Sequence, residues 1–60
     1  MGNTQYTIQY YAQNGALSYY HVWANSEGEA ISEFNNWVRE QKRGLSNYDS
    51  KFGEIYRIES

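Results

Sequence analysis

The apolar residues of this 60-residue chain change their spacing twice along the sequence. They alternate over Tyr6 to Ala24, follow a helical spacing over Ala30 to Val38, and alternate again over Phe52 to Ile58. Alternation places every second side chain on one face of a strand, whereas offsets of three and four place side chains on one face of a helix. The sequence therefore predicts two strands, then a helix, then a third strand.

The size of the chain limits what its core can supply. A single domain spanning residues 1–60 buries only about 60% of the surface that its unfolded chain exposes. Small domains often compensate with disulfides or metals, but this chain has no cysteine and a single histidine, His21. Aromatic residues make up 18% of the sequence and bury much area per residue. We therefore expect aromatic packing and a homodimer, with no metal and no cofactor.

The first two strands can pair in two registers across the turn at Gln13-Asn14-Gly15, where Asn and Gly tolerate positive φ. A two-residue loop pairs Tyr10 with Tyr19, and its core-facing residues on the second strand are Leu17, Tyr19, His21 and Trp23. A three-residue loop with Gly15 in a bulge pairs Tyr10 with Ser18, and its core-facing residues are Tyr20, Val22 and Ala24. One residue of slip inverts the strand. We favour the second register, because small side chains leave room for a helix above.

The helix has signals at both ends. Ser26 and Glu29 fit the capping-box pattern, in which the serine accepts from a free amide and the glutamate reaches back. The apolar face that follows is Ala30, Ile31, Phe34, Trp37 and Val38. Gly44 is expected to end the helix as a left-handed cap, with Leu45 folding back onto the last turn.

The third strand is marked by Phe52, Tyr56 and Ile58, although Gly53 and Glu54 blur its start. It can lie antiparallel to the first strand, which gives the spatial order 2-1-3 and a right-handed crossover through the helix. The expected fold is therefore α+β: a three-stranded antiparallel sheet with one helix packed on one face. The other face of the sheet stays uncovered.

Catalysis finds little support in the sequence. His21 could act as a general base with Ser18, Asp49 or Glu54, but no nucleophile-elbow motif surrounds it. Metal ligands lack suitable spacing, and there is no glycine-rich phosphate loop. We expect a protein that is not an enzyme.

The expected location is the cytoplasm. No stretch approaches the ~20 apolar residues that span a bilayer, so no membrane association is expected. The N-terminal residues 1–5 have neither a basic start nor an apolar signal core. The absence of cysteine suits a reducing compartment.

The uncovered sheet face is the candidate site. Tryptophan, tyrosine and arginine, which are enriched at interface hot spots, gather there in the favoured register. The predicted partner-binding residues are Tyr11, Tyr19, His21, Trp23, Ile55 and Arg57. Two alternatives stay open: these residues form ordinary cross-strand pairs, or the register is the other one and Trp23 belongs to the core.

Three uses of such a face compete. It can self-associate, capture another protein, or stack single-stranded nucleic acid on its aromatic rings. Nucleic acid is disfavoured by the net charge of −2 and by the location of Arg39, Lys42 and Arg43 at the helix end, where they compensate the helix dipole. A protein-binding module is the favoured interpretation, with a single-stranded nucleic-acid-binding module as the alternative.

Two segments carry a resemblance to known small proteins. Residues 22–30, Val-Trp-Ala-Asn-Ser-Glu-Gly-Glu-Ala, and residues 55–60, Ile-Tyr-Arg-Ile-Glu-Ser, look like a pattern that recurs in short phage and mobile-element proteins of strand–strand–helix–strand layout. That resemblance implies a phage-encoded inhibitor, acting in the host cytoplasm, that binds and blocks a host protein. The layout is also similar to that of a small archaeal large-subunit ribosomal protein, which implies RNA binding.

Overall fold

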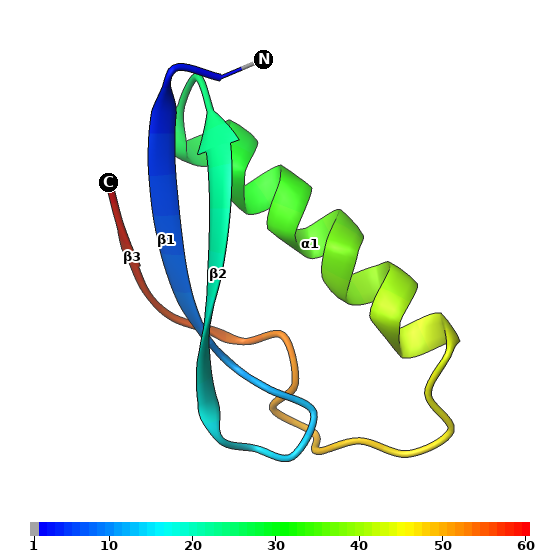
Figure 1. Cartoon of the computed structure of the whole chain (residues 1–60). Helices are drawn as coiled ribbons and strands as arrows, with labels where there is room; N and C mark the ends of the chain where they lie inside the picture. Colours follow the sequence, from blue (N-terminus) through cyan, green and yellow to red (C-terminus); the bar gives the residue numbers. More distant parts are fainter. Residues whose placement is uncertain (1) are drawn as a thin grey trace.

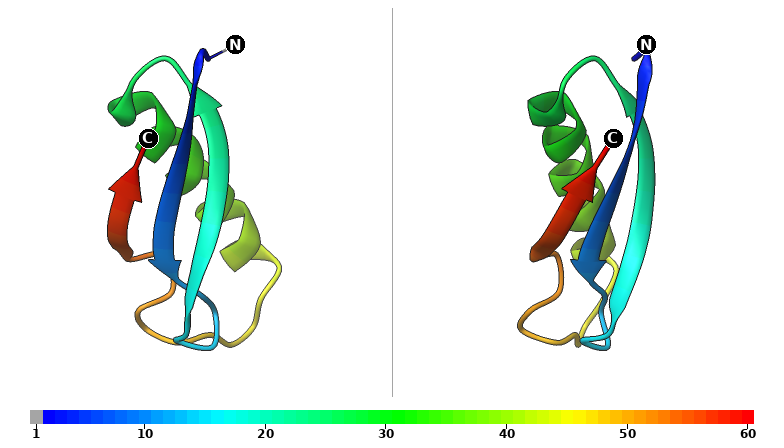
Figure 2. Two further views of the ribbon diagram at one scale, coloured as in Figure 1. Left: turned by 60° about the vertical axis from the view of Figure 1, so that its left-hand side comes forward. Right: turned by 90° about the vertical axis from the view of Figure 1, so that its left-hand side faces the viewer.

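The computed structural model describes residues 2–60 and shows the predicted α+β fold (Figure 1). In chain order its elements are β1 (Thr4–Tyr11), β2 (Leu17–Ala24), α1 (Glu27–Arg43) and β3 (Ile55–Glu59). The sheet is antiparallel with the order β2-β1-β3. In the left view of Figure 2, α1 lies behind the sheet and β3 and β2 flank β1, so the β2–α1–β3 crossover is right-handed, as predicted.

The hairpin between β1 and β2 adopts the favoured register, with Tyr10 opposite Ser18. The amide of Ala12 donates to the carbonyl of Ala16 at 2.7 Å, and the amide of Gly15 donates to the carbonyl of Ala12 at 2.9 Å. Gly15 has a φ of +86°, which a residue without a Cβ adopts at little cost. The three-residue loop therefore turns the even-numbered residues of β2 toward the helix.

The core lies between α1 and the sheet. Ile8 and Phe34 are fully buried, and the Phe34 ring packs against Tyr10 with centroids 5.1 Å apart. Tyr20 lies against Trp37 at 4.8 Å. Around this cluster the half-buried apolar residues are Ala12, Tyr20, Val22, Trp37, Leu45 and Ile58. Aromatic packing does supply much of the interior, as the composition predicts.

The start of α1 is capped as predicted. Ser26 Oγ accepts from the amide of Glu29 at 3.1 Å, and Glu29 Oε1 accepts from the amide of Asn25 at 2.8 Å. The predicted left-handed cap at Gly44 is wrong, because this residue has a φ of −91°. The amides of Gly44 and Leu45 donate to the carbonyls of Gln41 and Lys42, so the last turn tightens and two of its free carbonyls are bonded without positive φ.

The segment before β3 differs from the sequence prediction. The sequence predicts that Phe52 belongs to the third strand, but this residue lies in the loop ahead of Ile55 and is buried in the core cluster. Gly53 follows with a φ of +94° and passes close to Val38 of α1. A register shift then occurs opposite Gln9 and Tyr10 of β1. This shift changes which residues of β3 share a face.

Candidate protein-binding face

The face of the sheet opposite α1 is the open face. It is built from alternate residues of each strand, and because directly opposed residues of an antiparallel pair share a face, the register assembles them into rows. From β1 and β2 these residues are Gln5, Thr7, Gln9, Tyr11, Leu17, Tyr19, His21 and Trp23, and β3 adds Arg57 and Glu59.

Aromatic rings dominate the β2 side of the open face. Trp23 is 59% exposed and Tyr19 is 61% exposed, and the two flank His21 along the strand. The alternative in which Trp23 belongs to the core is excluded by the register. Tyr20 is the β2 aromatic residue that packs against the core instead. The centre of its ring lies 5.5 Å from that of Phe34, and the ring also contacts Trp37.

Hydrogen bonds from β1 hold the side chains of His21 and Tyr19 in place on β2. Thr7 Oγ1 lies 3.0 Å from His21 Nδ1, and Gln9 Nε2 donates to the Tyr19 hydroxyl at 3.4 Å. Both bonds are exposed, so each adds little to stability. Their effect is to restrict the rotamers of the ring-bearing residues before anything binds.

A second group of side chains lies on the β3 side. Arg57 is opposite Gln9, and its Nε lies 3.7 Å from Glu59 Oε2. The ring of Tyr11 meets that of Tyr56 edge-on at 6.2 Å, and Lys51 Nζ lies 5.3 Å from the centre of the Tyr11 ring. Charges of both signs therefore border the aromatic residues.

Ile55 does not occupy the predicted position. The register sets it opposite Tyr10, a residue whose ring lies in the core, and it is 36% exposed at the edge of the sheet. Tyr56, which alternation from Ile58 assigns to the helix side, is 58% exposed and contacts Tyr11 instead. The register shift inverts the facing, and no residue type in the sequence announces such a shift.

The proposed catalytic partners of His21 do not gather around it. Ser18 differs from His21 in parity along β2 and so lies toward the other face of the sheet. Asp49 lies in the loop before β3, where its Oδ1 accepts from the amide of Lys51 at 2.8 Å. The carbonyl of Glu54 accepts from the amide of Tyr11, four residues along β1 from Thr7, the residue opposite His21. The imidazole of His21 forms its hydrogen bond with Thr7, whose hydroxyl is neither a base nor an acid at neutral pH.

One tyrosine has a perturbed hydroxyl. Burial raises the pKa of Tyr20 above its ordinary value of 10.0, and Glu33 and Tyr10 act in the same direction. A raised pKa keeps the hydroxyl protonated at neutral pH, so Tyr20 is a packing residue rather than an activated nucleophile.

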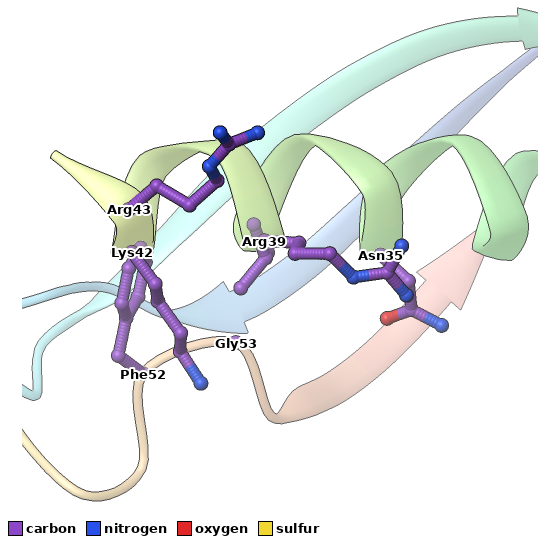
Figure 3. A pocket seen from close by; sticks show the side chains of 7 residues that line it. Asn35, Arg39, Lys42, Arg43, Phe52 and Gly53 are labelled. Atoms are coloured by element: carbon purple, nitrogen blue, oxygen red, sulfur yellow. The ribbon is translucent and has the colours of Figure 1, made fainter.

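A hollow lies on the helix side of the molecule, between α1 and the loop before β3 (Figure 3). It has a volume of about 510 Å³ and is lined by Asn35, Val38, Arg39, Lys42, Arg43, Phe52 and Gly53. Lys42 reaches down toward Gly53, whereas Arg43 points away from the hollow and forms an ion pair with Glu40 at 3.3 Å. These cations therefore lie away from the aromatic open face.

The described part of the chain has neither a metal-binding cluster nor a membrane-spanning helix. Residues 2–60 contain no cluster of three or more histidines, cysteines and carboxylates placed to hold a metal ion. Over the same residues, α1 lacks the length and apolar character needed to cross a bilayer.

The chain matches no family model, no curated protein and no solved structure.

Proposed function

We propose that this chain is a non-enzymatic protein-binding module that works as a homodimer and binds another protein through its open face. The observation that carries this proposal is the pair of rings on β2, Trp23 and Tyr19, each more than half exposed. Large aromatic side chains turned to solvent on a regular element are the residues that dominate interface energetics.

The polar groups among the rings support a protein partner. Thr7, Gln9 and His21 offer hydrogen-bonding groups between aromatic residues, while Arg57 and Glu59 offset each other in charge. Such a surface suits a flat partner of mixed apolar and polar character and low net charge. Binding would cover a surface of the partner and so block it, which is the mode of action that the resemblance to small phage proteins implies.

Single-stranded nucleic acid is the second candidate. Tyr11 with Tyr56, bordered by Lys51, resembles the stacking platforms of single-strand binders. The charges weaken this candidate, because Lys51 is a single cation beside these rings, Arg57 is paired with Glu59, and the cations of α1 lie on the helix side. Phosphate recognition depends on free cations beside the stacked bases.

Affinity capture with matched variants tests the proposal. A double variant, Tyr19→Ala with Trp23→Ala, removes the two rings, whereas Tyr48→Ala removes an exposed ring that lies in the loop before β3. We expect a protein retained by the original chain and by Tyr48→Ala, and lost from the double variant. The purified protein should then bind the chain directly, with the same dependence on the two rings.

Two results would contradict the proposal. A purified partner that binds the double variant as tightly as the original chain would place the site elsewhere. Binding of single-stranded RNA or DNA, with an affinity that falls steeply with salt and depends on Tyr11 and Tyr56, would support the second candidate instead.

A further inference from the structure

The two edges of the sheet differ in how they are protected. β3 is five residues long, contains Arg57 and Glu59, and has a register shift. β2 is eight residues long, has no lysine, arginine, carboxylate or proline, and pairs with β1 without a shift. Short strands, charges, prolines and bulges are the means by which proteins block pairing at a free edge. β2 has none of them.

The backbone groups on the free edge of β2 can be identified from the hairpin. The amide of Ala12 donates to the carbonyl of Ala16, which marks a hydrogen-bonded position at the end of the hairpin, and bonded and non-bonded positions alternate along an antiparallel ladder. The even-numbered residues of β2 therefore bond to β1, and the groups of the odd-numbered residues point outward. The outward residues are Leu17, Tyr19, His21 and Trp23. The bonds of Tyr11 to Gly53 and Glu54, on the β3 side, fit the same alternation.

We propose that β2 pairs antiparallel with β2 of a second copy, about a two-fold axis at Tyr20, and joins the two sheets into one. This inference rests on the proposed function, since it specifies how the homodimer forms. In Figure 2, β2 forms an outer margin of the sheet and α1 crosses behind it. Opposed residues share a face, so the two open faces become one continuous surface with both helices on the other side.

The register follows from the outward groups. Hydrogen-bonded pairs must join an outward residue of one copy to an outward residue of the other, which excludes an axis midway between Tyr20 and His21. An axis at Tyr20 pairs Leu17 with Trp23 of the second copy and Tyr19 with His21 of the second copy. An axis at His21 leaves Leu17 unpaired and opposes two imidazoles. An axis at Tyr20 therefore gives every outward residue a hydrogen-bonding partner in the second copy.

The strand suits a second copy better than an unrelated peptide. The outward backbone groups of β2 lie symmetrically about Tyr20. The donors of one copy therefore align with the acceptors of the other. No charged side chain on β2 opposes another across the pair. The pairing also adds buried surface to a chain whose own core is small.

The decisive variant removes one outward donor and keeps every side chain. Chemical synthesis of the full chain with an N-methyl group on the His21 amide blocks the edge, because that amide does not bond to β1. Ser18→Ala is the matched control, since it changes a helix-side side chain of the same strand and keeps every outward donor. Sedimentation velocity over a concentration series measures self-association, and circular dichroism checks that the helix is retained.

We expect the original chain and Ser18→Ala to dimerise, and the N-methyl chain to dimerise at least about tenfold more weakly. Hydrogen exchange on the original chain gives an independent measurement. The amides of Tyr19 and His21 should gain protection as concentration rises, while the amide of Tyr20, already bonded to β1, should not change.

The two proposals fail in different ways. A monomeric original chain, or equal dimerisation of the N-methyl chain, overturns edge pairing. Self-association that survives N-methylation but is lost in the Tyr19→Ala and Trp23→Ala double variant places the contact on the open face instead. Partner capture that persists in a monomeric N-methyl chain supports protein binding through the open face and contradicts a need for the dimer.

Discussion

The ring of Tyr20 lies against the ring of Trp37, with centroids 4.8 Å apart, and this contact fixes which face of β2 belongs to the core. Because strand side chains alternate, packing Tyr20 against the helix places the side chains of Tyr19 and His21 on the open face. Trp23 follows them onto the open face. The two tryptophans of the chain therefore have opposite roles, one in packing and one on the candidate binding surface.

Alanine substitution of each tryptophan should separate these roles. Trp23→Ala is expected to change the free energy of unfolding by less than about 0.5 kcal/mol, as exposed positions do. Trp37→Ala removes the neighbour of Tyr20 and Phe34 and should cost about 2 kcal/mol or more. Urea unfolding followed by circular dichroism compares them. Equal losses from both variants would contradict the assignment of Trp23 to the surface.

The raised pKa of Tyr20 predicts a loss of stability in alkali. The folded chain holds the Tyr20 proton more tightly than the unfolded chain, whose tyrosine has the ordinary value of 10.0. Stability should therefore be unaffected by this group below about pH 10 and should fall as pH rises further, through the folded pKa. Unfolding midpoints measured from neutral pH to about pH 11 test this.

Tyr20→Phe is the control for that measurement. It keeps the packing of the ring and removes the hydroxyl, so its midpoint should fall less steeply with rising pH than that of the original chain. The same slope in both proteins would assign the alkaline loss to other groups.

Gly53 is predicted to resist substitution. Its φ of +94° disfavours residues with a side chain, and a Cβ there would lie 2.7 Å from Val38 Cγ1. Gly53→Ala should therefore cost about 2 kcal/mol or more, through backbone strain and displacement of a core side chain. Gly28→Ala is the matched control. Its added Cβ would meet only Ser26 Oγ, at 4.0 Å, and should stabilise the helix by a few tenths up to about 0.5 kcal/mol.

The fold could be predicted because local signals agree with packing in most of the chain. Asn14 and Gly15 specify the turn, and small residues on β2 select the register that leaves room for α1. Ser26 and Glu29 begin the helix where the sequence indicates. At these positions, the local backbone geometry that the sequence favours is also the one that packing of the core requires.

The third strand could not be predicted in the same way. Phe52 is apolar at a strand-like spacing, yet it packs in the core from a loop, because Gly53 turns the chain beneath Val38. The shift opposite Tyr10 then exchanges the facing of Ile55 and Tyr56. Bulges depend on how two distant strands are aligned, so the sequence of β3 alone does not reveal one.

The cap at Ser26 offers a further stability test. Ser26→Ala leaves the amide of Glu29 without its partner and should cost about 1 kcal/mol. Ser32→Ala is the control, since Ser32 is exposed within α1 and alanine favours helix. Thermal or urea unfolding should show a loss for the first variant and none for the second. Equal effects would mean that the cap bond contributes nothing.

The open face should show an uneven distribution of binding energy. With a purified protein partner, Trp23→Ala and Tyr19→Ala should each weaken affinity by about tenfold or more, because these rings present the largest exposed areas of the face. Arg57→Ala should change affinity by less than about threefold, since its charge is exposed and already offset by Glu59.

Isothermal titration with the three variants measures this distribution. Unchanged stability in each variant shows that a loss of affinity comes from the contact itself. A larger loss for Arg57→Ala than for either ring, together with strong salt dependence, would identify an electrostatic interface and contradict the aromatic one that the exposure of Trp23 and Tyr19 predicts.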